Sequence, residues 1–231
     1  YHLEQKEGPL KYNGVVYNEM KGAFSSPDEV LEREIMNHLF PDTTYGCESG
    51  GDPKNIPDLT YENFLNFHRT YYHPSNSYIY LYGNMDMEEK LAFLDEHYLS
   101  HFDYLDVDSV IQEQKAFGAC RDVTLEYPVA ENEGEEDNTY LSYNMVVGNA
   151  ADSQMAMAFE VLDYALLSAP GAPLKQALLD AGIGTDVDVD FCDIMRQSTF
   201  SVYTKNAKPG LRDKFTEVLR ATLQQQVDQG I

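Results

Sequence analysis

The order of apolar and polar positions predicts mainly helices in the first hundred residues. Apolar side chains three or four positions apart form stripes, which is typical of one face of a helix. Start signals such as Ser26-Pro27-Asp28-Glu29 and stop signals such as His73-Pro74 set the boundaries. The helices expected there cover residues 26–39, 60–73 and 86–102. Within residues 77–83 tyrosines alternate with Ile79 and Leu81, which predicts a strand.

The pattern changes after residue 103. Periodicity fades between residues 104 and 120, where we expect a linker between a first part, 1–103, and a second part, 121–231. The elements expected in the second part are strands at 122–129 and 139–147 around an acidic turn at 131–137, helices at 152–167 and 173–182, strands at 185–191 and 199–204, and a final helix from Pro209. Strands that follow one another in runs favour an α+β fold, with antiparallel sheets packed against helices.

The composition of the chain argues against two classes of partner, nucleic acids and membranes. The chain has 231 residues and a net charge of −23, so a nucleic-acid partner, which needs clustered Lys and Arg, is not expected. An acidic surface attracts basic ligands, but solubility explains the same charge equally well. No apolar run approaches the roughly twenty residues of a membrane-spanning helix, and the first residues do not resemble a signal peptide. We therefore expect no membrane partner.

The ends and the cysteines add two expectations. The chain starts without Met at Tyr1 and stops just after a helix-like segment, so we expect it to be cut from a larger protein. Its three cysteines are far apart and form no CxxC pair. That argues against a disulfide framework and against a cysteine zinc site, and it favours a reducing compartment.

The segment GVVYNEMKG, residues 14–22, places one carboxylate behind an apolar run. In a helix, Glu19 falls three and four residues after Val16 and Val15, on the face that they share. We expect that face to turn toward protein. Because an isolated buried carboxylate is expensive, Glu19 should be paired, bound to a metal or protonated.

Two histidines compete with Glu19 as candidate metal ligands. His97 and His101 lie one helical turn apart, as zinc-binding histidines often do. However, no glutamate stands between them to act as a base, and His101 continues an apolar stripe. A packed or interfacial role is the better interpretation of this pair.

The segment DVDVDFCD, residues 186–193, offers acids at every second position. A calcium loop of the EF-hand type would need Gly at its sixth position and Glu at its twelfth, where this chain has Phe191 and Gln197. On a strand, Asp186, Asp188 and Asp190 share one face. We interpret this face as solvated or turned toward a groove.

Two blocks of sequence carry a family resemblance. GVVYNEMKGAFSSPD and the longer block TYGCESGGDPKNIPDLTYENFLNFHRTYYHPSNSYIYLYGNMD together resemble the presequence-protease branch of the insulinase-like (pitrilysin) zinc metallopeptidases. PGAPLKQALLDAGIG extends the similarity more weakly toward the C-terminus, so it covers nearly the whole chain. In this family an HxxEH motif supplies two zinc-binding histidines and a base, and a glutamate from a later helix is the third ligand. Glu19 in NEMKG matches that glutamate.

The resemblance implies a piece of such an enzyme, because this sequence contains no HxxEH. Residues 1–103 would be the later part of a first, catalytic domain, residues 104–120 a linker, and residues 121–231 the earlier part of a second domain. The parent protein would be a zinc endopeptidase that hydrolyses short unstructured or targeting peptides inside a closed chamber. The chain alone would supply one zinc ligand and would be inactive.

The resemblance also indicates a peptide-binding region. The loop around Gly171 and the strand from Thr185 to Asp190 are similar to a region that anchors the N-terminal end of substrates by strand addition. This implies substrate contacts by Gly171, Thr185, Asp186, Asp188 and Asp190. The expected partners are peptides, with basic ones favoured by charge, and the rest of the parent chain.

The expected location is intracellular, in the bacterial cytoplasm or, for a eukaryotic protein, in an organelle matrix.

Two functional alternatives stay open at this point. The alternative to a peptidase is a non-catalytic structural or partner subunit of the same fold. An HxxEH motif upstream of Tyr1 in the parent reading frame would favour the peptidase.

Overall fold

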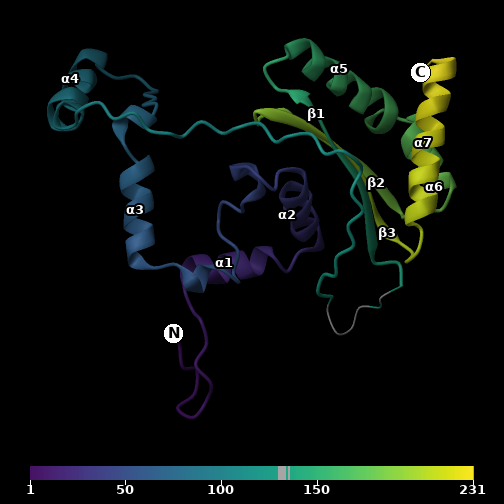
Figure 1. Cartoon of the computed structure of the whole chain (residues 1–231), viewed down its shortest axis with the longest axis horizontal. Helices are drawn as coiled ribbons and strands as arrows, with labels where there is room; N and C mark the ends of the chain where they lie inside the picture. The colour runs from purple at the N-terminus through teal and green to yellow at the C-terminus, as the bar shows by residue number, and fades with distance from the viewer. Residues whose placement is uncertain (130–133, 135, 231) are drawn as a thin grey trace. The chain divides into compact units, whose positions relative to one another are not determined.

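The computed structural model describes residues 1–129, 134 and 136–230, and it combines helices with one antiparallel sheet (Figure 1). The α+β class expected from the sequence is confirmed. The helices are α1 (Val15–Ala23), α2 (Pro27–Leu39), α3 (Tyr61–Tyr71), α4 (Met87–His97), α5 (Ser153–Asp163), α6 (Pro173–Asp180) and α7 (Arg212–Gln229). Short 3₁₀ turns are η1 (Thr44–Gly46), η2 (Ile56–Asp58), η3 (Pro74–Asn76) and η4 (Leu99–His101), and η5 (Tyr164–Ser168) is a π-helical turn.

The chain folds into two compact units. Unit 1 contains Tyr1–Tyr17 and Gly51–Ile111, and unit 2 contains Asn18–Gly50 and Gln112–Ile231. Residues 18–50 thus make their contacts with the second half of the chain. The domain boundaries expected from the sequence, at 103 and 120, stay a prediction about the complete protein.

The sheet of unit 2 has three strands in the order β1-β3-β2. They are β1 (Thr139–Asn149), β2 (Asp186–Cys192) and β3 (Gln197–Ala207), and β3 pairs antiparallel with both neighbours. The register places Leu141 and Val187 on either side of Thr204, so these three side chains share one face. That face is buried: Val187 and Thr204 are fully inaccessible to solvent.

The buried face of the sheet is covered by α5, η5, α6 and α7, as Figure 1 shows. The core residues are Leu141, Leu166, Leu167, Leu174, Leu178, Ile183, Val187, Phe200, Val202, Ala207, Phe215 and Leu219. Fully burying one such large side chain stabilises a fold by about 1.5–3 kcal/mol. Unit 2 therefore has a continuous core of its own.

Helix α2 lies on the opposite face of the sheet. It contacts β1, and Asp28 in its first turn forms an ion pair with Lys205 of β3, with 2.7 Å between Oδ1 and Nζ. Lys205 and Thr204 are adjacent on a strand, so their side chains point to opposite faces. The sheet thus has an apolar face under α5–α7 and a polar face toward α2.

Most predicted helices are confirmed, and two caps are seen. The Thr60 side chain accepts a hydrogen bond from the Asn63 N–H, and Asp86 accepts one from the Glu89 N–H. Pro27 begins α2 as expected, but the Ser26 side chain makes no capping bond. The helix expected to reach residue 102 ends at His97, where η4 follows after one residue.

Two predicted strands are wrong for this chain. Residues 77–83 and 122–129 contain no strand, although both alternate in the way that strands do. A strand needs a neighbouring strand, and the described residues place neither segment in a sheet; Pro128 also lacks a backbone donor. Of the acidic turn expected at 131–137, residues 131–133 and 135 lie outside the described residues.

The turn between α6 and β2 depends on Gly184. Its φ is +72°, in the left-handed region that favours glycine. A Cβ at this position would overlap the Thr204 side chain and the backbone oxygen of Lys205. Gly184 thus permits the close approach that starts β2 beside β3.

We expect Gly184→Ala to destabilise unit 2 more than Gly210→Ala does. Gly210 has a similar φ of +83°, but no atom lies within 4 Å of a Cβ built there. The control should lose about 1 kcal/mol of unfolding free energy through backbone strain alone, and Gly184→Ala about 2 kcal/mol more through overlap. Urea unfolding of both variants measures the difference. Equal losses would show that the contact with β3 is unimportant.

Candidate functional site

Strand β2 presents a row of acids on the polar face of the sheet. Asp186, Asp188 and Asp190 are exposed, while Val187 between them is buried. The alternation expected from the sequence is confirmed, because successive side chains of a strand point to opposite faces. The three carboxylates therefore form one acidic edge of unit 2.

The residues of β3 that face these acids include one cation. In the register of the sheet, Asp186 is opposite Lys205, Asp188 opposite Tyr203 and Asp190 opposite Ser201. The Lys205 ammonium lies 5.6 Å from the centre of the Tyr203 ring. Its hydrogen bond to Asp28 raises the pKa of Lys205, against the opposing effect of burial. Lys205 thus contacts Asp28 of α2 as well as Tyr203 of its own strand.

Helix α2 adds carboxylates toward the same face. Burial is the largest cause of the raised pKa of Glu32, and the charges of Glu29, Asp190 and Glu48 raise it further. Burial likewise raises the pKa of Asp190, with Asp163 and Asp188 adding to it. Like charges from α2 and β2 therefore face one another across the polar side of the sheet. A hollow of about 250 Å³ beside α2 has Glu29, Glu32 and Glu48 in its lining.

The acids of α2 were not identified as site residues from the sequence. Glu29 and Glu32 are three positions apart on a predicted helix, so their shared face could have been read from the spacing. The approach of Glu32 to Asp190 could not, because it joins segments more than a hundred residues apart.

Two further predicted substrate contacts, Thr185 and Gly171, also belong to unit 2. Thr185 precedes β2; its N–H donates to the Lys205 carbonyl over 3.0 Å, and its hydroxyl accepts from the Asn206 side chain. Gly171, with φ of +75°, lies in the loop before α6 and lines a separate hollow of about 280 Å³. Thr185 is not among the residues that line this hollow.

Glu19 lies on α1, as expected, but its surroundings differ from the expectation. Val15 and Val16 are 85% and 53% exposed, and Glu19 is exposed as well. The expectation that this helix face turns toward protein is wrong for this chain. The half-buried residues of α1 include Met20, whose sulfur lies close to the backbone of Gly50. A different side of the helix therefore makes the contacts.

The described residues do not form a complete metal site. Within the part of the chain that the structure describes, no three His, Cys, Asp or Glu side chains are grouped so that they could hold a metal ion. Glu19 therefore fits a zinc ion only as one ligand among others. His97 and His101 are both exposed, and the His97 ring lies 4.6 Å from the Phe93 ring. Neither histidine is a core residue in this chain.

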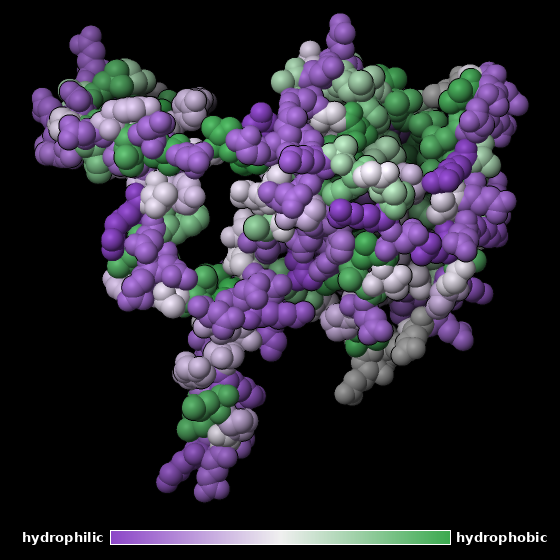
Figure 2. All heavy atoms as spheres, in the orientation of Figure 1, coloured by the Kyte–Doolittle hydropathy of each residue, from purple (hydrophilic) through white to green (hydrophobic). Residues whose placement is uncertain are grey.

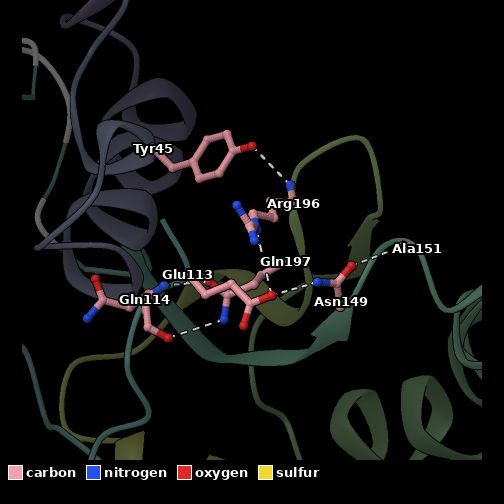
Figure 3. A network of polar contacts seen from close by, with 7 residues as sticks. All are labelled: Tyr45, Glu113, Gln114, Asn149, Ala151, Arg196 and Gln197. Carbon is pink, nitrogen blue, oxygen red and sulfur yellow. Dashed lines mark hydrogen bonds and ion pairs between the residues drawn. The ribbon is translucent and has the colours of Figure 1, made fainter. Parts of the chain in front are cut away.

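A network of polar contacts in unit 2 was not expected from the sequence (Figure 3). The backbone N–H of buried Gln114 donates to the Gln197 side chain over 2.6 Å, and the Gln197 amide returns a bond to the Gln114 carbonyl. Nearby, Glu113 accepts from Asn149 and is 3.6 Å from Arg196. The network fixes the segment around residue 114 to the start of β3. Isolated glutamines in an irregular segment give no pattern that would predict this.

The chain matches a known protein family over most of its length. The model of the family described as "Peptidase M16 inactive domain" matches residues 58–231. The chain belongs to the peptidase M16 family. This confirms the family resemblance that the NEMKG and SGGDP segments indicated. The presequence-protease branch is confirmed as well, because several similar relatives carry that name.

Relatives of this M16 chain match it over its whole length. It is 51% identical over 231 residues to Protein HypA of Clostridium perfringens, covering 100% of this chain and 24% of that protein. It is 36% identical to Presequence protease 1, chloroplastic/mitochondrial, of Arabidopsis thaliana, covering 100% of this chain and 22% of the relative. The mitochondrial presequence protease of Xenopus laevis is 33% identical over 99% of this chain and 22% of its own length. The chain thus spans less than a quarter of these relatives.

A solved structure supports the fold. The putative M16-like peptidase from Alicyclobacillus acidocaldarius superimposes with a TM-score of 0.55 at 16% identity, covering 94% of this chain and 50% of that one. At this identity the likeness concerns the fold alone.

We expect Asp190→Asn to stabilise unit 2 at neutral pH and to have less effect in acid. The folded pKa of Asp190 is raised, so its contribution to stability is lost as pH rises from the unfolded to the folded pKa. An amide removes that loss. The melting temperature should therefore rise more at pH 7.5 than at pH 4. Asp186→Asn is the matched control, because Asp186 lies opposite Lys205; the same gain in the control would contradict the argument.

Proposed function

We propose that this M16 chain is part of a zinc-dependent endopeptidase that hydrolyses short unstructured or targeting peptides. The observation that carries the proposal is the match to presequence proteases over 99–100% of the chain, which includes the Glu19 segment as well as the acidic strand. Both the predicted metal ligand and the predicted peptide-binding strand therefore lie in the region of similarity.

In this proposal Glu19 is one of three protein ligands of the zinc ion. Its carboxylate is exposed on a regular helix, so groups from outside this chain can reach the same ion. Catalytic zinc takes three protein ligands and keeps one position for water, whose pKa it lowers toward neutrality. The chain's own contribution is to hold a negatively charged oxygen at a fixed helix position.

Unit 2 would bind the substrate peptide. The matched family domain is described as inactive, which suits a binding role better than a catalytic one. Strand β2 pairs with β3 on one side only among the described residues, so its other edge offers backbone groups to an extended peptide. Asp186, Asp188 and Asp190 would attract basic residues, Thr185 would contact the segment beside β2, and Gly171 would contact the peptide from its own hollow before α6.

The same relatives suggest where the protein acts. Those named above are described as mitochondrial or chloroplastic, or come from a bacterium, so the proposal places the protein in an organelle matrix or the bacterial cytoplasm. Among the described residues, no helix combines the length and apolar character that crossing a membrane requires.

The second candidate is a non-catalytic subunit of the same fold. The description of the matched domain as inactive favours it. Retention of NEMKG favours the peptidase, because a subunit without zinc has no need of the third ligand. An HxxEH motif elsewhere in the complete protein separates the two.

We expect Glu19→Gln in the complete protein to remove most of the bound zinc and nearly all peptidase activity. A neutral amide is a weaker ligand than a carboxylate, and losing one of three ligands lowers zinc affinity heavily. Metal content by mass spectrometry and cleavage of an unstructured peptide measure the two effects. Glu62→Gln, on the exposed first turn of α3, is the matched control. If zinc content and turnover of Glu19→Gln stay near those of the unmutated enzyme, Glu19 has a structural role only.

We expect the triple change Asp186→Asn, Asp188→Asn and Asp190→Asn to raise KM for an Arg-rich peptide at low salt. Exposed charges act during encounter and are screened over about 8 Å at physiological salt, so kcat should change little. The matched control removes three exposed acids of α4 by Glu88→Gln, Asp95→Asn and Glu96→Gln. Equal KM values for the triple variant and the unmutated enzyme would place these aspartates on a face that substrate does not approach.

A further inference from the structure

Unit 1 has the apolar pattern of a folded unit but no buried core. Every hydrophobic side chain that is buried in the described chain belongs to unit 2. Helices α3 and α4 bury no residue at all, and Figure 2 shows apolar side chains on the surface of this part. A unit of this size cannot offset its conformational entropy without burying apolar surface. Unit 1 is therefore incomplete by itself.

Exposed apolar residues occur throughout unit 1, and two groups of them, on α3 and in residues 77–83, are close in sequence. On α3, Phe64 and Phe67 are 68% and 59% exposed, on the stripe that continues to Tyr71. In residues 77–83, Tyr78, Tyr80 and Tyr82 are 103%, 85% and 86% exposed. Isolated exposed apolar residues are normal, but such a concentration marks an interaction surface.

Residues 77–83 have the composition of a strand that is covered on both faces. Tyrosines occupy one set of alternate positions, and Ile79 and Leu81 occupy the other. Surface strands alternate apolar with polar residues, whereas strands inside a sheet between two layers are apolar at successive positions. The segment is therefore suited to the interior of a sheet.

The backbone of this segment has no partner in the described chain. Residues 78–82 belong to no helix or strand, and the structure gives their N–H and C=O groups no hydrogen bond. Burying the tyrosines without pairing these groups would cost about 1–3 kcal/mol for each unpaired group. Whatever covers the side chains must therefore also supply backbone partners, as neighbouring strands do.

We propose that residues 77–83 are an interior β-strand in the complete protein, paired with a segment that lies outside these 231 residues. The side chains of Phe64, Phe67 and Tyr71 on α3 then pack on one face of the completed sheet. The occupant is assigned to the same polypeptide because this chain covers only 22–24% of the length of its relatives. A second copy of the chain suits the surface less, because one added strand would leave the other edge of residues 77–83 unpaired.

The test is amide hydrogen exchange, followed by mass spectrometry, of the complete protein and of the 231-residue chain. In the complete protein, peptides covering residues 77–83 should exchange at least ~100-fold more slowly than in the chain alone. Strand β3 serves as the internal control, because it is already paired on both sides and should be protected in both proteins. The inference does not depend on zinc or on peptidase activity, so loss of the proposed function would leave this result unchanged.

Two outcomes would overturn the proposal. Fast exchange of residues 77–83 in the complete protein would show that no segment pairs with them. Protection that appears in the chain alone and grows with its concentration would assign the surface to a second copy.

A pair of variants gives a second measurement on the complete protein. Ile79→Asp would place a carboxylate inside the completed sheet and should lower the melting temperature by more than ~5 °C. Ile194→Asp, at a loop residue that is 91% exposed, should change it little. Equal effects of the two variants would contradict an interior position for Ile79, and if Ile79→Asp prevents folding, the exchange experiment on the unmutated protein still decides.

Discussion

The burial of β3 is the constraint on which unit 2 depends. This strand has a neighbour on each side and helices over one face, so nearly all of its residues are buried or half-buried. Its buried side chains Phe200 and Val202 belong to the core under the helices, and its backbone holds β1 and β2 in register. Because side chains alternate, fixing this face toward the helices also fixes Tyr203 and Lys205 toward the opposite side. The polar face of the sheet is thus a consequence of the core.

The charges on that polar face are held in place by the same register. Asp28 of α2 forms an ion pair with Lys205. Burial raises the pKa of Glu32 on α2, and the charge of Asp190 raises it further. One ion pair attaches the beginning of α2, while further along the helix like charges face one another. An arrangement of this kind retains an unbalanced negative potential, which suits the attraction of basic peptides in the proposed function.

The two units differ in the interactions that stabilise them. Unit 2 has a continuous core and a buried polar network around Gln114 and Gln197. Unit 1 carries local signals of equal quality, including the caps at Thr60 and Asp86, but buries no hydrophobic side chain. Local hydrogen bonds start helices, whereas their stability in proteins comes mainly from packing of an apolar face. The M16 relatives, more than four times as long, are consistent with packing partners that lie in other parts of the protein.

The sequence by itself determined the elements whose signals are local. Apolar spacing, caps and glycines located α2–α7, the alternating acids of β2 and the family to which the chain belongs, because these depend on neighbours a few residues away. It did not determine whether residues 77–83 form a strand, whether the Glu19 face is covered, or that Glu32 approaches Asp190. Strand pairing, burial and contacts between charges depend on segments far apart in the chain or outside it. Only the tertiary structure decides these, because the free energy of forming a strand or of burying an acid depends on the partner as well as on the residue itself.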